Sequence, residues 1–227
     1  MPIRAVILDF DGTIYDSSSL NNAGRRIVEI VNKCGHKIPE NIYVRLKDNW
    51  GTGGTKMIAD SFGLDLEIAK EIYHEWWKID LTDPFPLIQG LKETLITLES
   101  RQIKILILTN RHRKNLTPIL NHFCLARFFD FIQTMDDWAF SKPDPHTFCF
   151  VLHQLAKSGI LSKECVYVGD TIMDFECTSA RGLTSVSVTT GVFNEPDFVK
   201  AGQKKENIIR SIADLPEWIE KYNKTHG

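Results

Sequence analysis

Seven side chains in this sequence are of the types that phosphoryl transfer requires. They are four carboxylates, a hydroxyl, an amide and a lysine: Asp9, Asp11, Asp170, Asp174, Thr109, Asn110 and Lys142. A carboxylate can attack phosphorus and form an aspartyl-phosphate, and Mg²⁺ prefers hard oxygen ligands of this kind. The lysine and the polar donors can neutralise charge on the transferring phosphoryl oxygens. The set therefore indicates Mg²⁺-assisted phosphoryl transfer, provided that the fold brings its members together.

Each of these motifs also has a simpler interpretation when it is taken alone. The two acids before Gly12 could be turn residues, and the Thr109-Asn110 pair could cap a helix. Lys142 could be an exposed surface lysine, which is the usual environment of lysine. The acids from Asp170 onwards suit the first turn of a helix, where carboxylates are favoured. The prediction of a site depends on the combination.

Five short, mostly apolar runs are predicted to be the strands that position these side chains, at residues 5–8, 103–108, 128–133, 165–168 and 184–189. Nearly continuous apolar runs are typical of parallel strands covered on both faces, and helical patterns separate most of these runs. The alternation predicts an α/β fold with a doubly wound parallel sheet. In such sheets ligands bind beyond the carboxyl ends of the strands. The candidate residues all follow one of the first four runs, so we expect them at that edge.

The segment from residue 15 to residue 85 interrupts the alternation. It has no convincing strand pattern, but it contains amphipathic helical patterns and ends in the linker-like Asp83-Pro84-Phe85-Pro86. We therefore predict an α/β core domain from residues 1–14 and 86–227, and a helical subdomain from residues 15–85. The polar, lysine-rich stretch at residues 202–207 is predicted to be a mobile surface loop.

The order of four motifs, DFDGT, ILTN, KP and GDTIMD, resembles the haloacid dehalogenase superfamily. The likeness extends over nearly the whole chain, and the helical segment resembles the helical cap of that superfamily. Chain length and cap position resemble the branch that holds phosphoglycolate phosphatases and β-phosphoglucomutases. The resemblance implies a Rossmann-like core with an inserted cap, and Mg²⁺ as cofactor.

The resemblance also implies roles for the acids. Asp9 would be the nucleophile and a metal ligand. Asp11 would be the general acid and base, and its backbone carbonyl would bind the metal. Asp170 would bind the metal directly, and Asp174 would hold the metal site directly or through water.

The resemblance implies that the remaining members of the set bind the phosphoryl group. Thr109 and Asn110 would hold that group, and Lys142 would bridge it and the nucleophile. Dehalogenases of this superfamily lack an aspartate at the position of Asp11, because they protonate no leaving oxygen. The second acid thus favours phosphate esters.

Three activities remain open at this point, and a phosphatase is preferred among them. A phosphomutase of the β-phosphoglucomutase type would need a further phosphate contact in the cap. Gly53, Gly54 and Lys56 could supply one as a glycine-rich substrate loop, although they could equally be a turn between helices. A non-catalytic protein that binds a phosphorylated metabolite is the third alternative.

Composition limits the choice of partners. The 227 residues include 43% hydrophobic and 25% charged residues with a formal net charge of −2, which favours neither nucleic acid nor a membrane. No apolar run suits a secretory signal, and the five scattered cysteines suggest reduced thiols in the cytoplasm. We therefore expect a cytoplasmic monomer or homodimer acting on a small phosphorylated metabolite.

Overall fold

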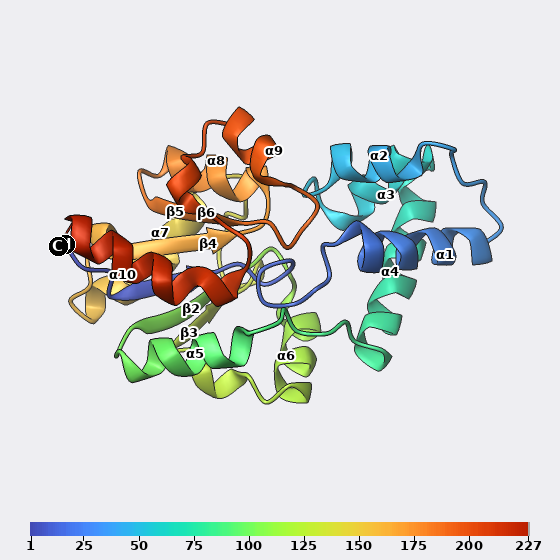
Figure 1. The fold of residues 1–227 in the computed structure, drawn as a ribbon. Coiled ribbons are helices and arrows are strands. Elements are labelled where there is room, and N and C mark those ends of the chain that lie inside the picture. The colour runs from blue at the N-terminus through green and yellow to red at the C-terminus, as the bar shows by residue number, and fades with distance from the viewer. Residues whose placement is uncertain (227) are drawn as a thin grey trace.

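A six-stranded parallel sheet forms the centre of the computed structural model, which describes residues 1–226 (Figure 1). Its order is β3-β2-β1-β4-β5-β6. The strands are β1 (Ala5–Leu8), β2 (Lys104–Leu108), β3 (Phe131–Gln133), β4 (Cys165–Gly169), β5 (Thr184–Val188) and β6 (Ile208–Ile209). Each neighbouring pair is parallel. The prediction of a doubly wound parallel sheet is therefore confirmed, and its first five strands lie where apolar runs indicated them.

Helices cover both faces of the sheet because side chains alternate along each strand. Val6 and Leu8 of β1 belong to a buried cluster with α5, α6 and α10, whereas Ala5 and Ile7 pack in a second cluster with α7 and α8. The helices of this core are α5 (Leu91–Ser100), α6 (Arg113–His122), α7 (Phe148–Lys157), α8 (Ile172–Ala180), α9 (Glu195–Lys200) and α10 (Leu215–His226). Burial of one Val, Leu or Ile side chain contributes roughly 1.5–3 kcal/mol, so these two faces hold the sheet edge in place.

A helical unit lies beside the sheet and has its own hydrophobic cluster, which includes Ile27, Leu46, Ile58 and Ile72 (Figure 1). After a helical turn at Leu20–Gly24 it contains α1 (Arg25–Lys33), α2 (Ile42–Asn49), α3 (Gly54–Phe62) and α4 (Leu66–Thr82). We call residues 20–82 the helical insert. The chain leaves the core and returns to it side by side, because Tyr15 makes an isolated bridge with Leu87. Because this bridge lies where the chain leaves and re-enters the core, it supports residues 15–85 as our proposed bounds of the subdomain.

The C-terminal region agrees only in part with the prediction. Residues 202–207 were expected to form a mobile surface loop, and Lys204, Lys205 and Glu206 are exposed, but Gln203 is buried and its amide donates to the hydroxyls of Ser185 and Ser187. The short strand β6 follows and pairs with β5. Two residues are too few to produce a detectable periodicity, so only packing against β5 reveals this strand. Within the described residues, every helix is too short or too polar to cross a membrane.

Candidate active site

The carboxyl ends of three neighbouring strands place the first side chains of the site. Asp9 follows β1, Thr109 follows β2 and Asp170 follows β4, and all three are buried. Because these strands are parallel and adjacent, the three side chains lie at one edge of the sheet. Six of the seven predicted residues line one cavity there: Asp9, Asp11, Thr109, Asn110, Lys142 and Asp170.

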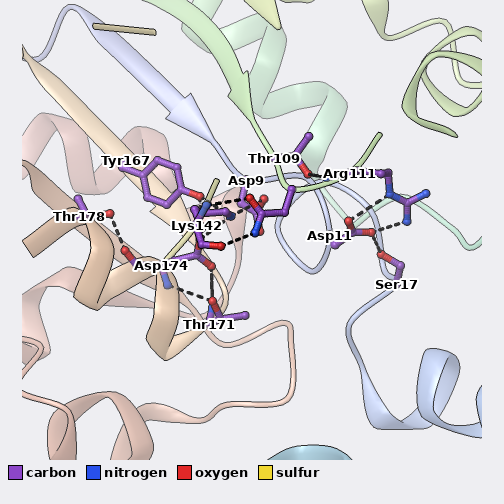
Figure 2. A network of polar contacts seen from close by, with 11 residues as sticks. Asp9, Asp11, Ser17, Thr109, Arg111, Lys142, Tyr167, Thr171, Asp174 and Thr178 are labelled. Atoms are coloured by element: carbon purple, nitrogen blue, oxygen red, sulfur yellow. Dashed lines mark hydrogen bonds and ion pairs between the residues drawn. The ribbon is translucent and has the colours of Figure 1, made fainter. Parts of the chain in front are cut away.

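Lys142, in the wall of this cavity, is held by three oxygen atoms (Figure 2). Its Nζ atom lies 2.9 Å from Asp9 Oδ1, 2.6 Å from Asp174 Oδ1 and 2.9 Å from the hydroxyl of Tyr167. Burial alone would lower the pKa of Lys142, but the charges of Asp174 and Asp9 outweigh it and raise that pKa. The ammonium therefore stays charged beside Asp9. The sequence did not indicate that Tyr167 belongs to the site, since a tyrosine within an apolar strand is typical of the hydrophobic core.

Asp174 is fully engaged by protein donors. Lys142 and the Tyr167 hydroxyl donate to its Oδ1, while the backbone N–H and hydroxyl of Thr171 donate to its Oδ2. The Thr171 hydroxyl accepts from the Asp174 N–H in return, which makes a capping box at the start of α8. In this arrangement Asp174 anchors the lysine and the helix, and neither carboxylate oxygen is free of donors.

Asp170 has the opposite environment. Both of its carboxylate oxygens are buried and have no hydrogen-bond partner among residues 1–226. A Cβ atom at Gly12 or Gly191 would lie 2.1 Å or 2.0 Å from Oδ2, so two glycines are needed to admit this carboxylate. Burial, with the charges of Asp9 and Asp174, raises the pKa of Asp170 well above its usual range. A buried, unpartnered carboxylate of this kind is neutralised either by a proton or by a bound cation.

The acids around Asp170 fit a divalent metal. Asp9, Asp170 and Asp174 each offer an oxygen atom, and these atoms lie within 4.8 Å of one another. Burial raises the pKa of Asp9 to about 7 despite the opposing charge of Lys142. Hard oxygen donors with an excess of negative charge are what Mg²⁺ prefers. Since both oxygens of Asp174 are occupied, Asp9 and Asp170 are the side chains with capacity to bind it.

Asp11 is held by an arginine that was not among the predicted residues (Figure 2). The Arg111 Nε atom donates to Asp11 Oδ2 at 3.1 Å, Nη2 pairs with Oδ1, and the Ser17 hydroxyl donates to the same carboxylate. Burial would raise the pKa of Asp11, but the charge and hydrogen bonds of Arg111 prevail and lower it. Asp11 is therefore ionised in this conformation.

Arg111 also connects the site to the helical insert. Its Nη1 atom lies 2.8 Å from Oδ2 of Asp80 in α4, and Asp80 Oδ1 accepts from the Tyr15 hydroxyl at 2.7 Å. The side chains of Arg111 and Asp80 are only 4% and 3% exposed. A buried pair of this kind links the general-acid candidate to α4. Its only sequence signal was an arginine directly after Thr109-Asn110.

The two polar residues after β2 have different surroundings. The Asn110 amide donates to the backbone carbonyl of Lys142 at 2.8 Å and its Oδ1 accepts from the Lys142 N–H at 3.0 Å, so this side chain positions the lysine loop. The Thr109 hydroxyl accepts from the Arg111 N–H and keeps its own proton to donate. The Asn110 amide uses one of its two N–H groups in this contact, so both side chains keep a donor for a phosphoryl oxygen.

The helical insert supplies the opposite side of the cavity. Gly53 and Gly54 line it, but Lys56 does not, because the Lys56 ammonium is exposed and pairs with Asp60 at 2.5 Å. Trp76 and Trp77 line the cavity as well. Neither was among the predicted site residues, because adjacent tryptophans within an amphipathic helix are typical of core packing.

The comparisons with known proteins agree with this geometry. The family model described as "Haloacid dehalogenase-like hydrolase" matches residues 6–188. The chain belongs to this family. The resemblance noted in the sequence, and with it the assignment as a hydrolase, is therefore confirmed.

Named relatives of this haloacid dehalogenase-like hydrolase include phosphatases. A phosphoglycolate phosphatase of Pseudomonas savastanoi pv. phaseolicola is 26% identical over 201 residues, which cover 83% of this chain and 70% of the relative. An N-acetylmuramic acid 6-phosphate phosphatase of Pseudomonas aeruginosa is 25% identical and covers 87% and 86% of the two chains. A solved structure from Haemophilus somnus, described as a predicted phosphoglycolate phosphatase, has a TM-score of 0.77 at 20% identity, with coverage of 95% and 97%. This structural likeness shows the shared fold.

Proposed function

We propose that this protein is a Mg²⁺-dependent phosphatase that hydrolyses a small phosphomonoester through an aspartyl-phosphate on Asp9. One observation carries the proposal. Asp9 contacts the Lys142 ammonium at 2.9 Å, and it offers an oxygen within 4.8 Å of oxygens from the buried acids Asp170 and Asp174. A nucleophilic carboxylate between a fixed cation and a metal-binding acid suits attack on phosphorus.

The metal would be held by the side chains of Asp9 and Asp170 and by the backbone carbonyl of Asp11. When bound, Mg²⁺ supplies positive charge that stabilises the phosphoryl oxygens. Lys142 neutralises further charge on these oxygens, and the Thr109 hydroxyl donates a hydrogen bond to one of them.

The reaction has two steps in this proposal. A carboxylate oxygen of Asp9 attacks phosphorus, the bond from phosphorus to the ester oxygen breaks, and Asp11 gives a proton to the leaving oxygen. Asp11 then takes a proton from water, whose oxygen attacks the phosphorus of the aspartyl-phosphate. Inorganic phosphate leaves and the Asp9 carboxylate is regenerated.

Asp11 must be released from Arg111 before it can act as the acid, since that ion pair lowers its pKa. Arg111 is bonded to Asp80 in α4, so we infer that a shift of the helical insert on substrate binding changes the position of the arginine. Closure of this kind also excludes bulk water during the chemistry.

A phosphomutase would require a second phosphate contact in the insert. Lys56, the candidate suggested by the sequence, is paired with Asp60 at the surface. We therefore retain hydrolysis as the proposed reaction, with a small phosphorylated metabolite as substrate.

The test is hydrolysis of p-nitrophenyl phosphate with and without Mg²⁺, by wild type, Asp9→Asn and Asp60→Asn. Asp60 is an exposed carboxylate outside the cavity, so its variant controls for the substitution itself. We expect Mg²⁺-dependent turnover that falls at least about a thousandfold in Asp9→Asn only. Activity in Asp9→Asn close to that of wild type would exclude the covalent mechanism.

A further inference from the structure

The cavity has an aromatic and thioether side in addition to its ionic side. The residues on it are Trp50, Met57, Tyr73, Trp76, Trp77 and Met173. All except Met173 belong to the helical insert. Such side chains pack favourably against flat rings. The part of the substrate that leaves with the ester oxygen would face this side.

The rings on this side are packed against one another. The Tyr73 ring centroid lies 5.7 Å from that of Trp76 and 5.4 Å from that of Trp77, in edge-on geometry. A Cβ atom at Gly54 would lie 2.1 Å from the Tyr73 ring, so glycine is required there to make room for the ring. The need for glycine at position 54 is therefore explained by aromatic packing rather than by phosphate binding.

The ionic side has no free positive charge for a second anionic group. Among the described residues, Arg111 and Lys142 are the cations that line the cavity. Arg111 pairs with two carboxylates, and so does Lys142. Release of Asp11 from Arg111, as proposed above, still leaves Arg111 paired with Asp80. A substrate carboxylate or second phosphate would therefore be buried without a free cation beside it, which is costly.

The size of the cavity sets a further limit. Its volume is about 160 Å³, close to the roughly 150 Å³ of an engineered apolar cavity that binds benzene. Because the phosphoryl group shares this space, the organic part enclosed there is no larger than about one ring. The lining also contains the Trp76 indole N–H, which is buried and has no partner within residues 1–226, so it can donate to a polar substituent on that ring.

The geometry points to a substrate whose organic part is one aromatic ring without an anionic substituent, so that the enzyme acts on the phosphate ester of an aromatic alcohol. This inference rests on the proposed function, which it makes more specific. It predicts discrimination against carboxylated and bisphosphorylated phosphoesters and against those without a ring. The Tyr73 ring is a specificity-determining group in this scheme.

Binding of phosphonates tests the inference without turnover. Calorimetry in the presence of Mg²⁺ would compare benzylphosphonate with phosphonoacetate, cyclohexylmethylphosphonate and 2-aminoethylphosphonate. We expect benzylphosphonate to bind at least about tenfold more tightly than each of the others, the ratio that one or two aromatic contacts provide. A carboxylated, saturated or cationic compound that binds as tightly as benzylphosphonate would overturn the assignment.

Variants connect the preference to the aromatic side. Tyr73→Ala should reduce the ratio of the benzylphosphonate and phosphonoacetate dissociation constants about tenfold, and Tyr73→Phe should retain it because the ring remains. Trp138→Ala is the matched control, since Trp138 is an aromatic residue outside the cavity. An unchanged ratio in Tyr73→Ala would contradict the proposal.

Hydrolysis of p-nitrophenyl phosphate, an aromatic phosphate ester of the inferred class, is measured separately. Absence of this hydrolysis with intact benzylphosphonate selectivity would refute the phosphatase function and leave the ligand class standing. Hydrolysis of p-nitrophenyl phosphate without benzylphosphonate selectivity would overturn the ligand class and leave the phosphatase function standing.

Discussion

The buried ion pair between Asp80 and Arg111 allows a stability change to be worked out from the structure. Asp80 accepts hydrogen bonds from the Arg111 guanidinium at 2.8 Å and from the Tyr15 hydroxyl at 2.7 Å, and it is 3% exposed. In Asp80→Asn the shape is kept but the negative charge is lost. One partner of a buried pair is then uncompensated, which costs about 3–5 kcal/mol.

The expected cost lies at the lower end of that range because Arg111 retains its pair with Asp11. We take about 3 kcal/mol. For a chain of this size each kcal/mol lowers Tm by about 2–4 °C, so Tm should fall by about 6–12 °C. The assay is thermal unfolding followed by circular dichroism in EDTA, which prevents bound metal from masking the change.

Asp83→Asn is the matched control for this measurement. Asp83 follows the same helix and also pairs with an arginine, Arg26, at 3.0 Å, but its side chain is 78% exposed. Exposed pairs contribute at most about 1 kcal/mol, so Tm should change by less than about 4 °C. If Asp80→Asn lowered Tm no more than Asp83→Asn does, the buried pair would not stabilise the contact between α4 and the core, and the reasoning would be refuted.

Three further predictions concern the metal-binding acids and the cysteines. Because the folded-state pKa of Asp9, about 7, exceeds its ordinary 3.8, the stability of metal-free protein should fall as pH rises from about 4 to about 7 and then level off. Mg²⁺ should then raise Tm more at pH 8 than at pH 5, and equal shifts would contradict this. Gly191→Ala places a Cβ atom 2.0 Å from Asp170 Oδ2, so the Mg²⁺ concentration for half-maximal activity should rise at least about tenfold, whereas an unchanged midpoint would remove Asp170 from the metal site. Burial raises the pKa of Cys165 to about 12 while Cys34 is exposed, so iodoacetamide followed by peptide mass spectrometry should find Cys34 modified and Cys165 intact in native protein; rapid labelling of Cys165 would show that its strand opens.

The sequence by itself was sufficient for the first five strands of the sheet and for the acids and polar residues that follow them. Apolar runs before Asp9, Thr109 and Asp170 identify strands, and parallel pairing brings the ends of adjacent strands together whatever the rest of the chain does. The helical insert was also predictable, since amphipathic periodicity is a local property. These inferences depend only on neighbouring residues and on a general rule of α/β sheets.

Only the tertiary structure decided how the charges are paired. Asp11 and Arg111 are 100 positions apart in the chain, and Arg111 and Asp80 are 31 apart. Nothing local specifies such pairs, because an ion pair leaves no periodic pattern and its partners meet only when the insert packs on the core. For the same reason the sequence could not predict that Tyr73 lines the cavity or that Lys56 lies at the surface. Whether a side chain on a short helix faces the cavity or the solvent depends on how that helix is docked.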